Sequence, residues 1–264
     1  MLTKLVEPVE YALPIGDEKL PLNPYLGQTI RLRHLGQITC VGCGRITKKS
    51  FAQGYCYPCF TTKAACDRCI MSPELCHFAA GTCREPDWAK ENCFVDHFVY
   101  LANSSGLKVG ITRHTQVPTR WIDQGARQAI NLFRVKTRQQ SGFLEVAFKA
   151  HVNDKTHWQR MLKGEPEWVD LKARRDELIP LVKTPLERLQ NEHGVESFEF
   201  LPDAETVEIK YPVVTYPTKV KSFNLDKVST VEGTLLGIKG QYLILDTGVI
   251  NLRKYGGYHI GFDA

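Results

Sequence analysis

The residues with the most specific chemistry are nine cysteines, all of which lie within residues 40–93. Two C-x2-C pairs, Cys40 with Cys43 and Cys56 with Cys59, are separated by twelve residues. Two thiolates at this spacing bind one metal ion from a tight turn, and two such turns that face each other complete a closed tetrahedral site. These four cysteines therefore predict a structural zinc site.

The other five cysteines predict a second zinc site with less regular spacing. A third C-x2-C pair, Cys66 with Cys69, begins it. The choice among the remaining ligands stays open, and the candidates are Cys76, His77, Cys83 and Cys93. Reduced, buried cysteines without metal are the alternative. Because the chain has no H-x-E motif of the kind that zinc deaminases use, we expect one or two Zn²⁺ ions with a structural role.

The central third of the chain favours a second kind of chemistry, phosphate binding. Residues 103–175 contain 14 Lys and Arg against 6 Asp and Glu, a net charge of +8. Residues 1–102 carry +1 (11 against 10), and residues 176–264 carry −4 (9 against 13). A phosphate-bearing partner is attracted first to the most positive region. The alternative is a solvated surface without such a partner.

Alternating strands and helices must position this central region. The segments Phe98–Ala102 and Leu107–Thr112 flank a turn and predict a β-hairpin. Pro118 suits the first turn of a helix whose apolar positions extend from Trp121 to Ala129. In residues 130–136 apolar and polar side chains alternate, a pattern that predicts a third strand.

A second helix is predicted after Gly142, with Leu144, Phe148 and Val152 on its apolar side. Glu145 falls at the edge of this stripe, in the expected first turn. An acid at that place is either a partner of the helix dipole or a functional carboxylate.

The order strand, strand, helix, strand, helix over residues 97–155 resembles the GIY-YIG nuclease domain. Val99-Tyr100 is similar to the first signature dipeptide of that family, and residues 108–110 are similar to the second tripeptide. Arg120 matches the family arginine, and Glu145 matches the metal-binding glutamate.

This resemblance implies a role for each of four residues. Glu145 would hold Mg²⁺ or Mn²⁺, and Arg120 would donate to the phosphate. Tyr100 would orient or deprotonate water, with His97 as the alternative base if the first strand is shifted in register. Lys108 stands where the family usually has a second tyrosine and would clamp the phosphate.

Taken as a whole, the chain also resembles a prokaryotic family known as domain of unknown function 2797, which has no established activity. The passages that carry this resemblance are residues 56–59, 73–77, 81–86, 107–113 and 120–126.

We expect an α+β fold with three consecutive domains. Residues 1–96 are predicted to form N-terminal strands and a zinc ribbon, and residues 97–191 a GIY-YIG-like α/β domain with following helices. Residues 192–264 are predicted to form a β-rich module. Its segments Glu232–Ile238, Gln241–Asp246 and Gly248–Leu252 are separated by turn dipeptides and predict a meander or small barrel.

Together these features predict a zinc-containing protein that acts on DNA or RNA, as a divalent-metal-dependent endonuclease. A non-catalytic nucleic-acid-binding protein and a protein-interaction adaptor are the alternatives. A hydrophobic content of 43% and a charged content of 24% exclude wholesale disorder. We find no membrane-spanning segment and no secretory signal, and so expect a cytoplasmic protein without a membrane partner. The oligomeric state stays open.

Overall fold

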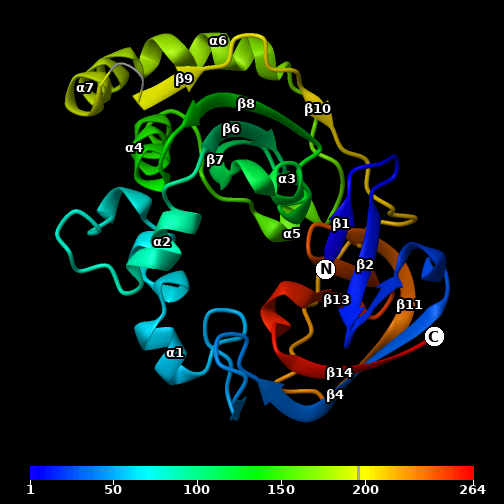
Figure 1. Cartoon of the computed structure of the whole chain (residues 1–264). Helices are drawn as coiled ribbons and strands as arrows, with labels where there is room; N and C mark the ends of the chain where they lie inside the picture. Colours follow the sequence, from blue (N-terminus) through cyan, green and yellow to red (C-terminus); the bar gives the residue numbers. More distant parts are fainter. Residues whose placement is uncertain (195–196) are drawn as a thin grey trace.

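The computed structural model describes residues 1–194 and 197–264, which form three antiparallel sheets, with the longer helices around the central one (Figure 1). The expected α+β class is therefore confirmed. Within the described residues, no helix combines the length and the apolar character needed to cross a membrane.

The central sheet has the strand order β10-β8-β6-β7, with β9 also paired to β8. Its strands are β6 (His97–Asn103), β7 (Leu107–Arg113), β8 (Gln128–Val135), β9 (Phe198–Phe200) and β10 (Val207–Glu208). The strands β6 and β7 form the predicted hairpin, in which Tyr100 lies opposite Gly110. The predicted third strand is also confirmed, and it pairs with β6.

The helices around this sheet are α3 (Thr119–Asp123), α4 (Arg138–Lys149), α5 (Trp158–Met161), α6 (Leu171–Leu181) and α7 (Lys183–His193). Helix α3 is shorter than predicted, since Ala129 already belongs to β8. Helix α4 begins before Gly142, because Thr137 and Gln140 form a capping box at its start. Glu145 therefore lies in the middle of α4, and its predicted place in the first turn is wrong.

The two faces of the central sheet pack against different parts of the chain. Alternate residues such as Val99 and Leu101 are fully buried against α4, α6 and α7. Tyr100 and Ala102 point to the opposite face and pack with Trp121 of α3. The sheet is thus covered on both sides, and it places Tyr100 on the side of α3.

A six-stranded sheet curls into a half-barrel with the order β13-β12-β11-β4-β14, and β5 pairs with β4 (Figure 1). Its strands are β4 (Thr29–Thr39), β5 (Ile46–Thr47), β11 (Thr230–Lys239), β12 (Tyr242–Leu245), β13 (Gly248–Asn251) and β14 (Tyr258–Asp263). The predicted C-terminal meander is confirmed, since β11, β12 and β13 pair consecutively and antiparallel.

The chain order of this half-barrel differs from the three consecutive domains that the sequence predicts. The N-terminal strand β4 lies between β11 and β14, which belong to the C-terminal region. The strands β9 and β10, expected in the C-terminal module, pair with β8 of the central sheet. Backbone pairing therefore crosses both expected boundaries.

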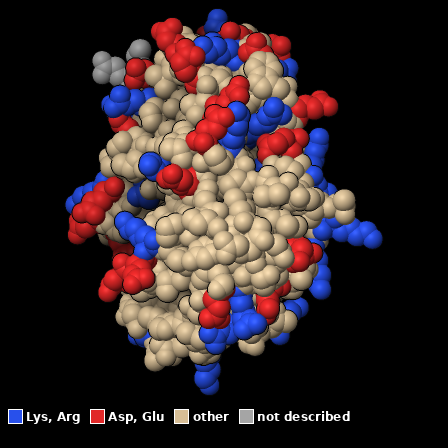
Figure 2. Space-filling view, turned by 90° about the vertical axis from the view of Figure 1, so that its right-hand side faces the viewer, with Lys and Arg blue, Asp and Glu red and all other residues tan. Residues whose placement is uncertain are grey.

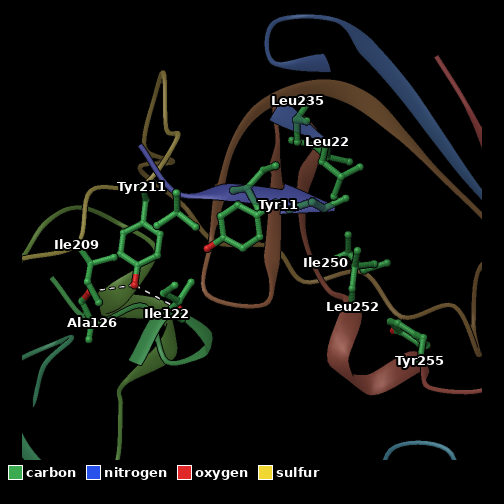
Figure 3. Packing of buried hydrophobic residues seen from close by; sticks show 14 of the residues in the cluster. Tyr11, Leu22, Ile122, Ala126, Ile209, Tyr211, Leu235, Ile250, Leu252 and Tyr255 are labelled. Atoms are coloured by element: carbon green, nitrogen blue, oxygen red, sulfur yellow. Dashed lines mark hydrogen bonds between the residues drawn. The ribbon is translucent and has the colours of Figure 1, made fainter. Parts of the chain in front are cut away.

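A small sheet of β1 (Leu2–Lys4), β2 (Glu10–Ile15) and β3 (Glu18–Pro21) lies beside the half-barrel. Figure 3 shows Tyr11 of β2 between Tyr211 and the buried leucines of this region. The Tyr211 hydroxyl donates to the carbonyl of Ala126 at 2.9 Å. This contact joins the half-barrel side of the core to the loop that follows α3.

The cysteine-rich segment runs from the half-barrel to the central sheet along one side of the molecule (Figure 1). It contains α1 (Tyr57–Thr62), α2 (Pro86–Asn92) and several single 3-10 turns. Its short elements contrast with the long strands on either side.

Candidate functional site

Cys40 and Cys43 lie in the turn between β4 and β5, and Cys56 and Cys59 lie at the start of α1. All four sulfur atoms lie within 4.8 Å of one another. The sulfurs of Cys43 and Cys56 are 3.8 Å apart, which matches the roughly 3.8 Å edge of a tetrahedron with Zn–S bonds of about 2.3 Å. The group can therefore hold a metal ion such as zinc.

Backbone amides lower the pKa of the thiols in this group, whereas burial raises it. Burial opposes ionisation of Cys40, but the amides of Cys56, Gly42 and Cys43 donate to its sulfur and lower its pKa to about 6. Burial and the neighbouring thiols raise the pKa of Cys59. Four adjacent thiolates repel one another, so a bound cation is needed to keep all of them ionised.

The first turn also depends on two glycines. Gly44 has a φ of +73°, a conformation that side chains other than glycine rarely adopt. A Cβ atom at Gly42 would lie 2.9 Å from the ring of Tyr55, so this position needs glycine for close packing. Tyr55 in turn packs against the buried cysteines.

Cys66 and Cys69 do not face the same neighbours, although the sequence places them in one pair. Burial raises the pKa of Cys66, and the charged groups that act on it are Arg84, Cys40 and Glu85. Burial also raises the pKa of Cys69, to about 11, and there the nearby groups are Asp67 and the thiols of Cys76, Cys93 and Cys83. The thiol of Cys66 is therefore influenced by the first cysteine group, and that of Cys69 by the later cysteines.

Tyr100 is completely buried on β6, where its hydroxyl donates to Oε1 of Gln124 at 2.9 Å. Burial raises the pKa of this hydroxyl, although the charge of Arg120 acts in the opposite sense. A Cβ atom at Gly110 would lie 2.6 Å from the Tyr100 hydroxyl, so the glycine makes room for the ring. Tyr100 therefore holds the end of α3 against the sheet.

Lys108 lies on β7 with only 4% of its surface exposed. Burial lowers its pKa to about 8, and the charge of Arg120 adds to this effect, whereas Glu145 and Asp154 oppose it. Neither Lys108 nor Arg120 has a carboxylate within 4.0 Å among residues 1–194 and 197–264. The charge of Arg120 thus acts on Lys108, and neither cation has a direct acidic partner among these residues.

Glu145 on α4 also acts on Lys108, and its side chain is 12% exposed. Burial raises its pKa, whereas Lys149 and Lys108 lower it. The Lys149 ammonium lies 3.4 Å from Glu145 and 3.2 Å from Asp154. We call Lys108, Arg120, Glu145, Lys149 and Asp154 the central polar cluster.

Sequence reasoning missed Lys149 and Asp154. Lys149 lies four residues after Glu145, a spacing that brings two side chains together on a helix. Asp154 follows α4, and its neighbour Asn153 pairs with Lys108 of β7. The helical spacing could have identified Lys149, but the position of Asp154 depends on the fold.

His97 is the alternative base of the sequence analysis, and it lies at the other end of β6. It is fully buried, its Nδ1 lies 2.7 Å from the carbonyl of Val95, and burial lowers its pKa to about 4. The charges near it are those of Arg138, Arg113 and His114. It therefore does not share the central polar cluster.

A hollow of about 860 Å³ lies between the small sheet and the half-barrel. Its lining includes Leu13, Tyr255 and His259 but none of the four predicted catalytic residues.

Figure 2 shows the side of the molecule with β2 and β11, where charges of both signs surround a broad area without charged residues. This side is not a continuous basic surface.

These features define an α+β protein with a four-cysteine group that can hold a metal ion and a separate cluster of buried and half-buried charges. The model of the family described as "Protein of unknown function (DUF2797)" matches residues 27–260, and the chain belongs to that family. Searches of curated proteins and of solved structures find no match. The comparisons thus give the GIY-YIG resemblance no support.

Proposed function

We propose that the protein binds nucleic-acid phosphates at the central polar cluster and hydrolyses phosphodiester bonds there with a divalent metal ion. The observation that carries this proposal is the pair of cations Lys108 and Arg120, which have no direct acidic partner among the described residues. When Lys108 is protonated, three cations outnumber two carboxylates in the cluster, and we expect the cluster to attract an anion. A phosphate group supplies that charge, and Arg120 can donate two hydrogen bonds to it.

The donor chemistry of the cluster is compatible with a hard metal ion. Glu145 and Asp154 already share one cation, the ammonium of Lys149. Mg²⁺ and Mn²⁺ prefer carboxylate oxygens, so these two residues would hold the ion in place of that ammonium. The bound ion would polarise a phosphate oxygen.

The proton chemistry is assigned to Lys108 rather than to Tyr100. The Tyr100 hydroxyl is buried and has a raised pKa, so it suits a positioning role. Lys108 has a pKa of about 8, so it is mostly protonated at neutral pH and then binds phosphate, as the sequence favours. Its neutral form gains population as the pH rises through about 8, and only that form can accept a proton.

Cleavage assays test the proposal with single- and double-stranded DNA and RNA in the presence of Mg²⁺ or Mn²⁺. Arg120→Ala and Glu145→Gln should each abolish cleavage and leave the folded protein intact by circular dichroism. Matched controls are Arg160→Ala and Glu187→Gln, which change exposed residues outside the cluster and should retain activity. Absence of cleavage on every substrate would contradict the hydrolytic part of the proposal.

A non-catalytic nucleic-acid-binding protein is the second candidate. It is favoured by Lys149, which already neutralises Glu145 and Asp154 without a metal ion. This alternative predicts salt-dependent binding that Arg120→Ala weakens, with no cleavage in any metal ion. Lys149→Met separates the two candidates, because it should strengthen metal-dependent cleavage only if a metal ion takes the place of the ammonium.

We also propose that the ion held by Cys40, Cys43, Cys56 and Cys59 is zinc with a structural role. The support is the short distance between the sulfurs, which leaves no coordination position for water. Metal analysis of the purified protein should find zinc, and Cys43→Ser should reduce its amount. A zinc-free protein in which α1 is folded would contradict this assignment.

A further inference from the structure

Four cysteines outside the first group come from four separate segments of the chain. Cys69 lies in the 3-10 turn Arg68–Ile70, and Cys76 follows the next 3-10 turn. Cys83 lies in the loop before α2, and Cys93 ends α2. Each of the four segments is short, and a tertiary contact is needed to hold it in place.

The first turn of α4 holds three of these segments. The backbone amide of Arg138 donates to the carbonyl of Cys93 at 2.7 Å, and its guanidinium donates to the carbonyl of Ile70 at 2.7 Å. The side-chain amide of Gln139 donates to the carbonyl of Cys76 at 3.3 Å. Helix α4 thus joins the backbone around Cys69, Cys76 and Cys93.

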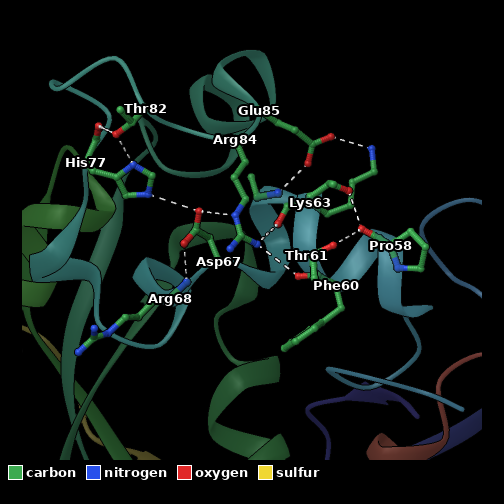
Figure 4. A network of polar contacts seen from close by, with 12 residues as sticks. Pro58, Phe60, Thr61, Lys63, Asp67, Arg68, His77, Thr82, Arg84 and Glu85 are labelled. Carbon is green, nitrogen blue, oxygen red and sulfur yellow. Dashed lines mark hydrogen bonds and ion pairs between the residues drawn. The ribbon is translucent and has the colours of Figure 1, made fainter.

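Side-chain contacts tether the fourth segment, that of Cys83, through the two residues that flank it (Figure 4). Thr82 bonds the His77 ring at 2.8 Å, which ties the loop to the Cys76 segment. Arg84 lies 2.9 Å from a carboxylate oxygen of Asp67, which ties the loop to the Cys69 segment. All four cysteines are therefore held around one place.

A positive charge lies near these four cysteines, as an anionic centre requires. Arg138 has a buried Nε atom with no hydrogen-bond partner among the described residues. Burial lowers the pKa of Arg138, whereas the thiols of Cys93 and Cys69 raise it. A cation with one N–H group that lacks a partner therefore lies beside the segments of Cys69 and Cys93.

The spacing of these sulfurs differs from that of the first group. No three of the four lie within 4.8 Å of one another in the part of the chain that the structure describes. The four sulfurs are therefore not grouped like those of Cys40, Cys43, Cys56 and Cys59, which all lie within 4.8 Å of one another around a place for one ion. A [4Fe–4S] cluster binds each cysteine sulfur at a different iron, so it takes sulfurs that lie farther apart, and this arrangement favours a cluster over a single ion.

Cys69 also lies within 4.8 Å of Asp67 and His77, which suggests a mononuclear site as an alternative. Asp67 and His77, however, are 3.3 Å apart and bond to each other. Asp67 also accepts from Arg84, and this neighbouring guanidinium would repel a metal cation. The contacts of Asp67 and His77 instead hold the cysteine segments in position.

We propose that Cys69, Cys76, Cys83 and Cys93 bind a [4Fe–4S] cluster. Four thiolates are the ligand set that such a cluster requires. This centre is separate from the zinc site of Cys40, Cys43, Cys56 and Cys59. Its presence does not depend on whether the central polar cluster binds or cleaves nucleic acid.

The test is metal and sulfide analysis of the full chain, purified without oxygen and reconstituted with ferrous iron and sulfide. We expect about four irons and four acid-labile sulfides per chain, with a broad visible absorption band. Retention of zinc at both cysteine groups, with no iron or sulfide bound after reconstitution, would overturn the proposal.

Two single variants check the ligand assignment. Cys76→Ser should remove most of the iron and sulfide and retain the zinc. Cys43→Ser should lower the zinc content and retain the iron. Equal loss of iron in both variants, in proteins with the wild-type circular dichroism spectrum, would contradict two separate centres.

Discussion

Between the central sheet and α4, the side chains of Val99, Leu101 and Leu144 are fully buried in one continuous apolar cluster. In the cysteine-rich segment, by contrast, the buried cluster consists of Cys40, Cys56 and Cys59 with the partly buried Tyr55 beside them. The first region can be stabilised by the hydrophobic effect, whereas the second buries little apolar surface, and its stabilisation by bound metal is what we propose. The difference suggests that the two regions respond to different perturbations.

Metal removal is expected to have the largest effect, and it should act on one region only. Structural zinc sites contribute on the order of 10 kcal/mol to the folding of small domains. A chelator should therefore remove the hydrogen-exchange protection of α1 and retain that of β6. Protection of α1 that survives proven loss of metal would contradict the comparison.

Leu144→Ala should have the next largest effect, this time on the central sheet. Leu144 is completely buried, and truncation of such a leucine costs about 3 kcal/mol of unfolding free energy. Urea denaturation measures the loss. Val146→Ala on the exposed side of α4 is the matched control and should change stability by less than about 0.5 kcal/mol.

Lys108 should make stability depend on pH. Its pKa is lowered to about 8 in the folded state, so between about pH 8 and pH 10 the unfolded chain binds more protons than the folded one. The free energy of unfolding should therefore rise by about 2 kcal/mol over this range. Urea denaturation of the wild type and of Lys108→Met at several pH values isolates this contribution. If the free energy of unfolding of the variant rises with pH as steeply as that of the wild type, the prediction is wrong.

The smallest effect is expected for an exposed ion pair. Lys183 and Glu187 on α7 lie four residues apart and 3.7 Å from each other, as a surface counterpart of Lys149 and Glu145. Glu187→Gln should lower stability by at most about 0.4 kcal/mol, with the loss shrinking in high salt. If Glu187→Gln lowered the free energy of unfolding as much as Leu144→Ala does, the prediction that exposed ion pairs contribute little would be wrong.

Several features of this protein could be predicted from local sequence. The C-x2-C spacing identified the group of Cys40, Cys43, Cys56 and Cys59, because two residues between thiols leave only a tight turn. Alternation and turn residues identified the hairpin of β6 and β7 and the meander from β11 to β13. These patterns succeed because each depends on contacts between residues that are near in sequence.

The tertiary structure decided the features that depend on distant contacts. Strand β4 pairs with β11 some two hundred residues later, and no local pattern specifies that partner. The different charged neighbours of Cys66 and Cys69 depend on the packing of whole segments, and so does the pairing of Asn153, next to Asp154, with Lys108. Burial is also a property of the complete fold, and for this reason the lowered pKa of Lys108 and the inaccessible hydroxyl of Tyr100 could be found only in the structure.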